Sequence, residues 1–330
     1  MSPAETTAAG SDGDAQAGRI VVVGSLNADL TIYCERLPLP GETAHGSGFA
    51  VNPGGKSANQ AVAASKLGGR VSLVGAVGED ANGAMLLAST AGAGVDVSRV
   101  RRSPDAATGV AVISVDAHGE NSIIISAGAN GTLAPADVVA SADAFDGAAV
   151  VCLCLEVSLE TVEAAARSGR DGGAMVLLNL SPYAQIPQSL AELSDVLLVN
   201  AHEASLFLGA AEVPGADADA LAWEPVRLKF AERGLDRVLV TLGAHGSVVL
   251  DSQAAKGHRI TRIAPTRVKA VDTTGAGDAF TGAVATRLAA GETLADAAAF
   301  ASVAAALAAT RKGTQAAYPG IQDVERLRAS

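Results

Sequence analysis

The sequence predicts an α/β fold, a three-layer α/β/α sandwich with a mostly parallel central sheet and a small second β-sheet beside it. Two observations carry this prediction. Short apolar runs alternate with helical stretches along most of the 330 residues, which is the order in which parallel strands and their covering helices follow one another. The runs are also continuous in Val, Ile and Leu, as in RIVVVG at 19–24, which predicts strands buried on both faces.

The expected elements follow one another without a linker after residue 18, so 19–330 should form one domain. Strands are predicted at 19–24, 71–78, 148–156, 174–180, 195–200 and 236–243. Helices are predicted at 56–67, 82–91, 159–167, 201–208 and 221–233. After residue 278 the chain turns almost wholly helical, with helices expected at 278–290, 294–309 and 322–329.

Two regions depart from this pattern. Residues 30–52 and 108–126 contain segments in which apolar and polar residues alternate, and the second is typical of a hairpin with its turn at 118–121. These regions could form a small antiparallel sheet that stands off the main one. Such a sheet could be a lid that closes over a ligand and excludes water, or it could consist of ordinary edge strands.

The composition excludes several classes of protein. With 49% hydrophobic and 18% charged residues, most of the chain can build a core, and only residues 1–18 are expected to be a disordered tail, without the features of a secretory signal. A net charge of −11 and an aromatic content of 3% argue against nucleic acid and anionic membranes as partners. The apolar stretch 297–309 is too short to span a bilayer, so we expect a soluble, cytoplasmic protein.

Cysteines and histidines give no sign of a disulfide framework or a metal-hydrolase site. There are three cysteines, and Cys152 and Cys154 lie in an apolar run where we expect them to be buried. The five histidines lack metal-ligand spacing. Neither GxGxxG nor GxSxG occurs, which argues against a dinucleotide-binding site and against a nucleophile elbow.

The strongest local signal is AVDTTGAGDAF at 270–280. The small residues Gly275, Ala276 and Gly277 allow backbone N–H groups to converge, and the helix that follows adds its free amides and the positive end of its dipole. This arrangement suits a phosphoryl group in transfer. Asp278 could accept a proton from an attacking hydroxyl, an effect of about 10² to 10⁴ in rate. The alternative is an Asp that only caps a helix after a glycine turn.

A second signal is NPGGKSANQ at 52–60. It is not a Walker A motif, because Ala50 stands where that motif requires glycine. The paired glycines, which include Gly55, could allow close backbone approach to a ligand. Lys56 and Asn59 should face the same way on the first helical turn, which suits a polyol, although a solvated helix start would look the same.

Further polar residues follow the predicted strands. Asn27 and Asp29 come after the first strand, at the edge of the sheet where ligands bind, and could hold vicinal hydroxyls or simply form Asx turns. TLGAHG at 241–246 gives a glycine-flanked turn that could lie along phosphates. Asn200 and Glu203 could hold a hydrated Mg²⁺.

Taken together, the chain resembles the ribokinase branch of the PfkB sugar-kinase family from about residue 19 to 319. The matching motifs, in the family's order, are GSLNAD, PGETAHG, NPGGKSANQAVAA, TGVAVI, GAN at 128–130, CLE at 154–156, NAHE, TLGAHG, DTTGAGD and TRKG at 310–313. The pair DTTGAGD and GGKSANQ is specific for the family, and GSLNAD with TRKG favours the ribokinase branch.

The resemblance implies ATP-dependent phosphorylation of D-ribose at its primary O5 hydroxyl, giving ribose 5-phosphate and ADP. Asp278 would be the general base and 275–277 the anion hole. The implied sugar contacts are Asn27, Asp29, Gly55, Lys56, Asn59, Glu156 and Asp278. The implied ATP contacts are Asn200, Thr241, Leu242, Gly243, Ala244, His245, Gly246 and Gly277, with Glu203 helping to organise Mg²⁺.

The resemblance also implies an activating K⁺ that shapes the anion hole, held mostly by backbone carbonyls. The matching residues are Asp272, Thr274, Ala308, Arg311 and Gly313. Lid strands in this family often clasp those of a second subunit, which implies a homodimer.

Three positions depart from the family pattern. Ala317 stands where many ribokinases have Ser as the last cation ligand, so water or a nearby carbonyl would have to substitute. Ser302 stands where Asn or His often touches adenine, which changes one base contact. Ser57 replaces a common glycine and is expected to cap the helix.

Two other functions stay open. Asn27 and Asp29 favour vicinal hydroxyls, which a ribonucleoside also has, so a related kinase could act on a nucleoside, on deoxyribose or on a keto sugar. A sugar-binding regulator without catalysis is a third hypothesis, and the presence of Asp278, the Gly-Ala-Gly turn and Glu203 argues against it.

Overall fold

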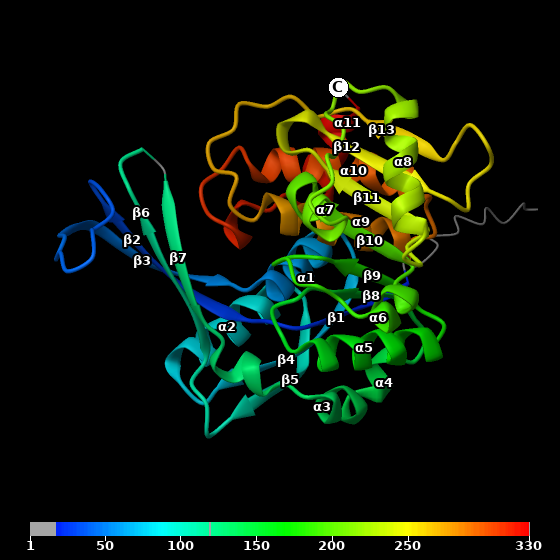
Figure 1. Ribbon diagram of the computed structural model, residues 1–330. Coiled ribbons are helices and arrows are strands. Elements are labelled where there is room, and N and C mark those ends of the chain that lie inside the picture. Colours follow the sequence, from blue (N-terminus) through cyan, green and yellow to red (C-terminus); the bar gives the residue numbers. More distant parts are fainter. Residues whose placement is uncertain (1–17, 119, 330) are drawn as a thin grey trace, which may run out of the picture.

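The computed structural model describes residues 18–118 and 120–329, so the predicted tail at 1–18 lies outside the described residues except for Gly18. The chain forms a three-layer α/β/α sandwich beside a smaller sheet (Figure 1). The strands of the main sheet are β1 (Arg19–Val23), β4 (Arg70–Gly78), β5 (Asp96–Ser103), β8 (Ala148–Leu153), β9 (Met175–Asn179), β10 (Val196–Asn200), β11 (Arg237–Thr241), β12 (Ser247–Asp251) and β13 (Ile260–Ile263). Their order is β13-β12-β11-β10-β9-β8-β1-β4-β5, and of its pairings only β11–β12 and β12–β13 are antiparallel, which confirms the predicted fold class.

The apolar run of β1 is buried on both faces of this sheet. Ile20 and Val22 pack into one hydrophobic cluster, and Val21 and Val23 pack into the other. Side chains alternate between the faces of a strand, so a strand in the middle of a two-faced core must be apolar at every position. This is the physical reason for the uninterrupted Val and Ile residues.

Helices cover each face of the sheet. One face packs against α1 (Lys56–Lys66), α2 (Ala81–Gly92), α9 (Ala276–Ala289), α10 (Leu294–Ala308) and α11 (Ile321–Arg328). The other packs against α3 (Pro135–Ala140), α4 (Ala142–Phe145), α5 (Leu159–Asp171), α6 (Gln188–Leu193), α7 (Ala201–Phe207) and α8 (Ala220–Ala231). Within residues 18–118 and 120–329, every helix is too short or too polar to serve as a membrane span.

Close packing of α1 on α9 brings two of the sequence motifs together. Gly282 of α9 lies so near α1 that an added Cβ would sit 2.5 Å from the carbonyl oxygen of Gln60 and 2.8 Å from Cβ of Ala63. Glycine is therefore required at this crossing. The consequence is that the first turn of α1 and the first turn of α9 are neighbours.

The smaller sheet, which we call the lid, consists of β2 (Asn27–Cys34), β3 (Gly46–Gly54), β6 (Gly109–Val115) and β7 (Asn121–Ser126), in the order β3-β2-β6-β7. It projects from one end of the main sheet (Figure 1). The expectation of an antiparallel sheet is wrong at its centre, because β2 and β6 pair in parallel. The two strands continue from β1 and β5, which run the same way in the main sheet. The predicted hairpin is confirmed, although Gly119 in its turn is not among the described residues.

Several elements and one cap differ from the sequence analysis. Strands β5, β12 and β13 and the short helices α3, α4 and α6 were not predicted; β5 reads DVSRVRRS, since an edge strand does not need an apolar run. Helix α9 begins at Ala276 and not at Asp278, because Gly275 in a left-handed conformation (φ 73°) is its N-cap. The expected cap at Ser57 is wrong, because Gly55 is the N-cap of α1, and the Ser57 hydroxyl donates to the carbonyl of Val23 at 3.4 Å.

Candidate active site

A cavity of about 160 Å³ lies at the carboxyl ends of the central strands. Sheets of this type bind ligands at that edge, because the loops there diverge. Its lining residues are Lys56, Asn179, Ser181, Leu198, Asn200, Glu203, Thr241, Gly275, Gly277 and Asp278. The cavity thus unites residues from four separate motifs, at 52–60, 200–203, 241–246 and 270–280.

The glycine turn before α9 leaves its helix N-terminus open toward this cavity. An added Cβ on Gly277 would meet no atom within 4 Å, whereas one on Gly275 would lie 2.4 Å from Cγ2 of Thr314. First-turn amides have no partner inside the helix and carry the positive end of its dipole. The amide of Ala276 donates to the carbonyl of Thr273 at 3.1 Å, whereas the amides of Gly275 and Gly277 have no backbone acceptor among the described residues.

Asp278 is buried in the first turn of α9, and both of its carboxylate oxygens accept hydrogen bonds. Asn59 donates to Oδ2 at 3.0 Å, and Gln60 donates to Oδ1 at 3.0 Å. Burial raises the pKa of Asp278, while the charge of Lys56 and the two amide donors oppose that rise. A buried carboxylate with a raised pKa is suited to accept a proton.

Lys56 is the cation of this cluster. Burial alone would lower its pKa, but the carboxylates of Asp278 and Glu156 raise it above the ordinary value. Glu156 is fixed in turn by the backbone N–H of Lys56 at 2.9 Å and by the hydroxyl of Ser25 at 2.5 Å. The ammonium group therefore stays charged between acidic groups.

The predicted sugar residues of the lid lie on its first strand. Asn27 is buried, and Asn130 donates to its Oδ1 at 2.8 Å, which leaves the amide N–H groups of Asn27 for a ligand. Asp29 lies in the same strand, and burial, with the negative charges of Glu156 and Asp278, raises its pKa to about 7. Donors and acceptors for neighbouring hydroxyls therefore lie on one strand.

The glycines at 54–55 serve the protein itself rather than open space for a ligand. A Cβ on Gly54 would lie 2.1 Å from Oδ2 of Asp29, and one on Gly55 would lie 2.7 Å from the backbone nitrogen of Asn27. The expected close approach is thus made by β2. It brings the start of α1 against the strand that carries Asn27 and Asp29.

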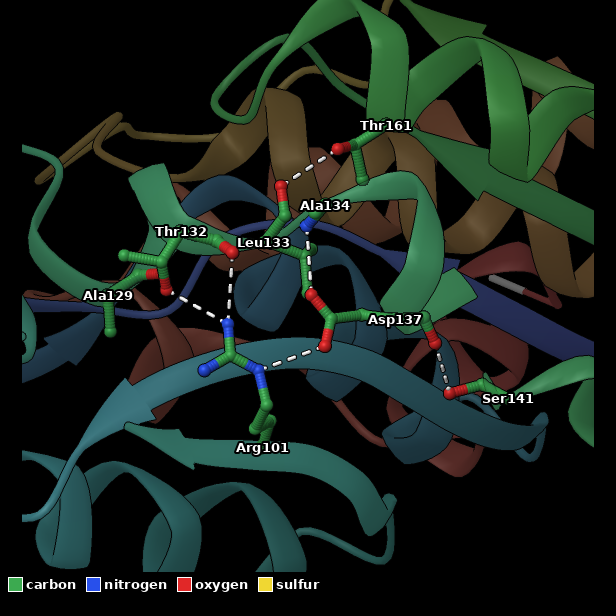
Figure 2. A network of polar contacts seen from close by, with 8 residues as sticks. All are labelled: Arg101, Ala129, Thr132, Leu133, Ala134, Asp137, Ser141 and Thr161. Atoms are coloured by element: carbon green, nitrogen blue, oxygen red, sulfur yellow. Dashed lines mark hydrogen bonds and ion pairs between the residues drawn. The ribbon is translucent and has the colours of Figure 1, made fainter. Parts of the chain in front are cut away.

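A network between β5 of the main sheet and the segment 129–137 holds Asn130 in place. Figure 2 shows Arg101 of β5 donating to the carbonyl and hydroxyl oxygens of Thr132 at 3.0 and 2.9 Å, and to Asp137 at 2.9 Å. Thr132 ends the 3₁₀ helix η1 (Gly128–Thr132), which contains Asn130. Asn130 also accepts from the N–H of Leu26 at 3.0 Å and donates to its carbonyl at 3.0 Å. The network therefore fixes the orientation of Asn27.

Asn200 and Glu203 form a reciprocal cap at the start of α7. The side chain of Asn200 accepts from the N–H of Glu203, and Oε2 of Glu203 accepts from the N–H of Asn200, both at 2.8 Å. Among the described residues there is no cluster of three metal-ligating side chains. A single acidic residue facing a cavity fits Mg²⁺, which usually keeps several waters and takes its other ligands from phosphates.

Of the other predicted nucleotide residues, only one is among those that line the cavity. Thr241 lines it, while Gly243, Ala244 and His245 are exposed on the short 3₁₀ helix η2 (Gly243–His245). Ser302 does not line the cavity, and its hydroxyl donates to the carbonyl of Ala264 at 3.3 Å.

Two chain segments bring the predicted cation residues together. The carboxylate of Asp272 accepts from the N–H of Thr274 and from that of Gly313, both at 3.0 Å, and the N–H of Arg311 donates to the carbonyl of Ala308 at 3.3 Å. Burial would raise the pKa of Asp272, but these hydrogen bonds outweigh it and lower the pKa below its ordinary value. Ala317, in the 3₁₀ helix η3 (Gln315–Ala317), is buried and offers no side-chain oxygen. Backbone carbonyl oxygens suit a hard cation, so these residues fit the predicted K⁺ site. Ala317 is the position where a side-chain ligand is missing.

Sequence reasoning missed several residues of the site. Gln60 and Gln315 are buried polar residues near Asp278, and Asn179 and Ser181 line the cavity. The polar pair Asn59–Gln60 within the otherwise Ala- and Val-rich α1 was the available signal for Gln60. No sequence pattern marks Gln315, since its position depends on how η3 packs against α1.

Comparison with known proteins agrees with this architecture. The model of the pfkB family of carbohydrate kinases matches residues 17–320, and the chain belongs to that family. It is 36% identical to a ribokinase of Schizosaccharomyces pombe, over 93% of this chain and 96% of the relative. It is 34% identical to a deoxyribokinase of Salmonella typhimurium, over 92% and 96% respectively.

Solved structures give the same picture. A ribokinase of Arabidopsis thaliana complexed with ribose and ATP superposes with a TM-score of 0.84 at 32% identity, covering 94% of this chain and 98% of that one. A ribokinase of Thermotoga maritima has a TM-score of 0.83 at 30% identity, covering 95% and 100%.

Proposed function

We propose that this protein transfers the γ-phosphoryl group of ATP to O5 of D-ribose, producing ribose 5-phosphate and ADP. The observation that carries the proposal is the buried Asp278, which shares one cavity with Lys56 and the open N-terminus of α9. The similarity to ribokinases, one of them complexed with ribose and ATP, supports the choice of substrates.

The proposed reaction is an in-line displacement. Asp278 takes the proton of the O5 hydroxyl as that oxygen forms a bond to the γ-phosphorus, and the bond to the bridging oxygen of ADP breaks. The amides of 275–277 stabilise the equatorial oxygens of the phosphoryl group. The protein contributes position and electrostatics, because the transferred group forms no covalent bond to it.

We further propose that ribose is held on the lid side of Asp278. The amide of Asn27 and the carboxylates of Asp29 and Glu156 would bind its hydroxyl groups, and Gly55, Lys56 and Asn59 would complete the contacts. The half-buried charges of Asp29, Glu156 and Lys56, beside the buried amides of Asn27 and Asn59, suit a small polyol.

ATP would occupy the other side of the cavity. We assign its phosphates to Asn200, Gly277 and the turn 241–246, and a base contact to Ser302. Mg²⁺ bound near Glu203 would neutralise phosphate charge. K⁺ at Asp272, Thr274, Ala308, Arg311 and Gly313 would be an activator, with water in place of a side chain at Ala317.

A homodimer formed through the lid and a cytoplasmic location complete the proposal. The support for the dimer is the lid surface, where the edge strand β7 exposes Ile123, Ile124 and Ile125 by 52%, 72% and 52%. An unpaired apolar strand edge is a surface that proteins usually cover.

The test is release of ADP over a panel of ribose, 2-deoxyribose, fructose and adenosine, in K⁺ and in Na⁺. We expect the highest kcat/KM with ribose and faster turnover in K⁺. The 34% identity to a deoxyribokinase makes 2-deoxyribose the second candidate, and a preference for it would transfer the proposal to that sugar. Saturation by adenosine alone, or ribose binding without ADP release, would contradict the proposal.

The variant Asp278→Asn tests the assigned base. It keeps the size of the side chain but removes the proton acceptor, so we expect kcat to fall by about 10² to 10⁴. Ribose binding, measured by calorimetry, should change little. A kcat equal to that of the natural protein would remove Asp278 from the mechanism.

A further inference from the structure

The carboxylate of Asp278 is held by two neutral amides from consecutive residues of α1. Asn59 Nδ2 and Gln60 Nε2 each lie 3.0 Å from a different oxygen of Asp278. A side-chain amide carries both donors and an acceptor, so it supports a carboxylate only when its nitrogen faces it. The hydrogen bond that each amide makes on the side away from Asp278 therefore decides whether its nitrogen or its oxygen faces the carboxylate.

Gln315 makes that outer contact for Asn59. Its Nε2 donates to Oδ1 of Asn59 at 3.0 Å, and both side chains are buried. The direction of these two hydrogen bonds is determined at Asp278. An ionised carboxylate only accepts, so Asn59 must donate to Asp278 and must accept from Gln315. At the outer end, Oε1 of Gln315 is buried without a partner in the described part of the chain. Burying an acceptor without a partner costs free energy. The Gln315 amide keeps this orientation nonetheless, which argues that its N–H donor is needed at Asn59.

The segment that carries Gln315 is anchored on both sides. Lys66 of α1 donates through Nζ to the carbonyl of Gln315 at 2.6 Å, and the hydroxyl of Tyr318 donates to the carbonyl of Gly275 at 3.2 Å. Gln315 thus sits on a fixed support between α1 and the glycine turn before α9.

We propose that Gln315 is a positioning residue for the reaction: its amide orients Asn59, and Asn59 orients the carboxylate of Asp278. This inference rests on the proposed function, because it takes Asp278 as the base. Without the donor of Gln315, the amide of Asn59 can rotate and turn its oxygen toward Asp278. The carboxylate then loses one of its two donors and the orientation they impose.

The charged and titratable groups that face Asp278 are Lys56 of α1, Asp29 of β2, Cys152 of β8, Glu156 and Tyr318. The substitution Gln315→Met leaves all five in place and adds no titratable group. A change in the pH dependence of kcat would therefore come from the loss of the hydrogen bonds that link Gln315, Asn59 and Asp278.

Two variants test the proposal: Gln315→Met and Gln315→Glu have nearly the shape of glutamine, and neither has an N–H donor at pH 8. We expect both to lower kcat about 10- to 100-fold, with a change in the KM for ribose of less than about threefold. The acid limb of the kcat profile of Gln315→Met should move to higher pH, because an ionised carboxylate with one donor fewer binds a proton more readily. The control is Gln322→Met, the same change at an exposed position of α11, which should leave kcat unaltered.

A double variant separates this inference from the proposed function. In the Asp278→Asn background, Gln315→Met should add less than about a twofold loss, since no base remains to be positioned. A full kcat in both Gln315 variants would overturn the inference, and so would an undiminished loss in the Asp278→Asn background. If Asp278→Asn itself keeps its kcat, the proposed base is wrong. Should Gln315→Met fail to fold in thermal unfolding, Gln315→Glu carries the test alone.

Discussion

Two carboxylates of the site, the buried Asp278 and the half-buried Asp29, differ in how the protein supports their charge. The carboxylate of Asp278 accepts from Asn59 and Gln60, whereas the carboxylate of Asp29 accepts no hydrogen bond from the described residues. The pKa of Asp29 is accordingly raised to about 7 by burial and by its acidic neighbours. An unsupported carboxylate is unfavourable for folding, and its natural partners would be the hydroxyl groups of the sugar.

Replacing Asp29 by Asn should therefore separate stability from function. In the folded protein Asp29 titrates near 7 and in the unfolded chain near 3.8, so the folded state binds the extra proton between these values and stability falls as the pH rises through them. We expect Asp29→Asn to raise the free energy of unfolding at pH 8 by on the order of 1–3 kcal/mol, a gain that disappears near pH 4.

Urea unfolding at the two pH values measures this effect, and the KM for ribose should rise at least about tenfold in the same variant. The exposed Asp105→Asn is the control and should change neither quantity. A loss of stability at pH 8 in Asp29→Asn would show that this carboxylate is well supported.

At the scale of the elements, the site depends on how α1 and α9 cross. An added methyl group at Gly282 would meet the carbonyl of Gln60 at 2.5 Å. We expect Gly282→Ala to separate the helices, to lower the free energy of unfolding by about 1–3 kcal/mol and to reduce kcat, because Asn59 and Gln60 then move away from Asp278.

The matched control is Gly92→Ala at the end of α2, where an added Cβ would meet nothing within 4 Å. This change should stabilise the protein by about 0.5–1 kcal/mol through the helix propensity of alanine, with kcat unchanged. Chemical unfolding and ADP release measure both variants. Equal stability and turnover in the two would disprove the role of the crossing.

The 3₁₀ helix η1 is a second element on which the site depends. Asn130 has two bonds to the backbone of Leu26 and one to Asn27. We expect Asn130→Ala to cost about 2–3 kcal/mol of stability and to raise the KM for ribose more than it lowers kcat, since Asn27 loses its orientation and Asp278 does not. A kcat defect with an unchanged KM would contradict this assignment.

Local sequence patterns predicted the elements of the core better than the contacts between them. The run RIVVVG specified β1 because burial on both faces demands apolar residues at every position. The edge strand β5 carries no such demand and was missed. Likewise Asp278 is visible in its glycine-rich motif, whereas its contacts with Asn59 and Gln60 depend on a helix crossing made by residues more than 200 positions apart.

On the scale of the whole molecule, the edge strand β7 exposes three consecutive isoleucines that nothing covers in a monomer. We expect the natural protein to sediment as a dimer and Ile124→Glu to sediment as a monomer, because a charge in the middle of an apolar strand edge opposes association. Leu221→Glu is the control: Leu221 is 81% exposed on α8, away from the lid. A dimer that survives Ile124→Glu would exclude β7 from the interface.

The most direct test of the whole account is a crystal structure with ribose and a non-hydrolysable ATP analogue bound together. We predict O5 of ribose within hydrogen-bonding distance of the Asp278 carboxylate, and the γ-phosphate at the backbone amides of 275–277. Either ligand bound away from this end of the sheet would contradict the account.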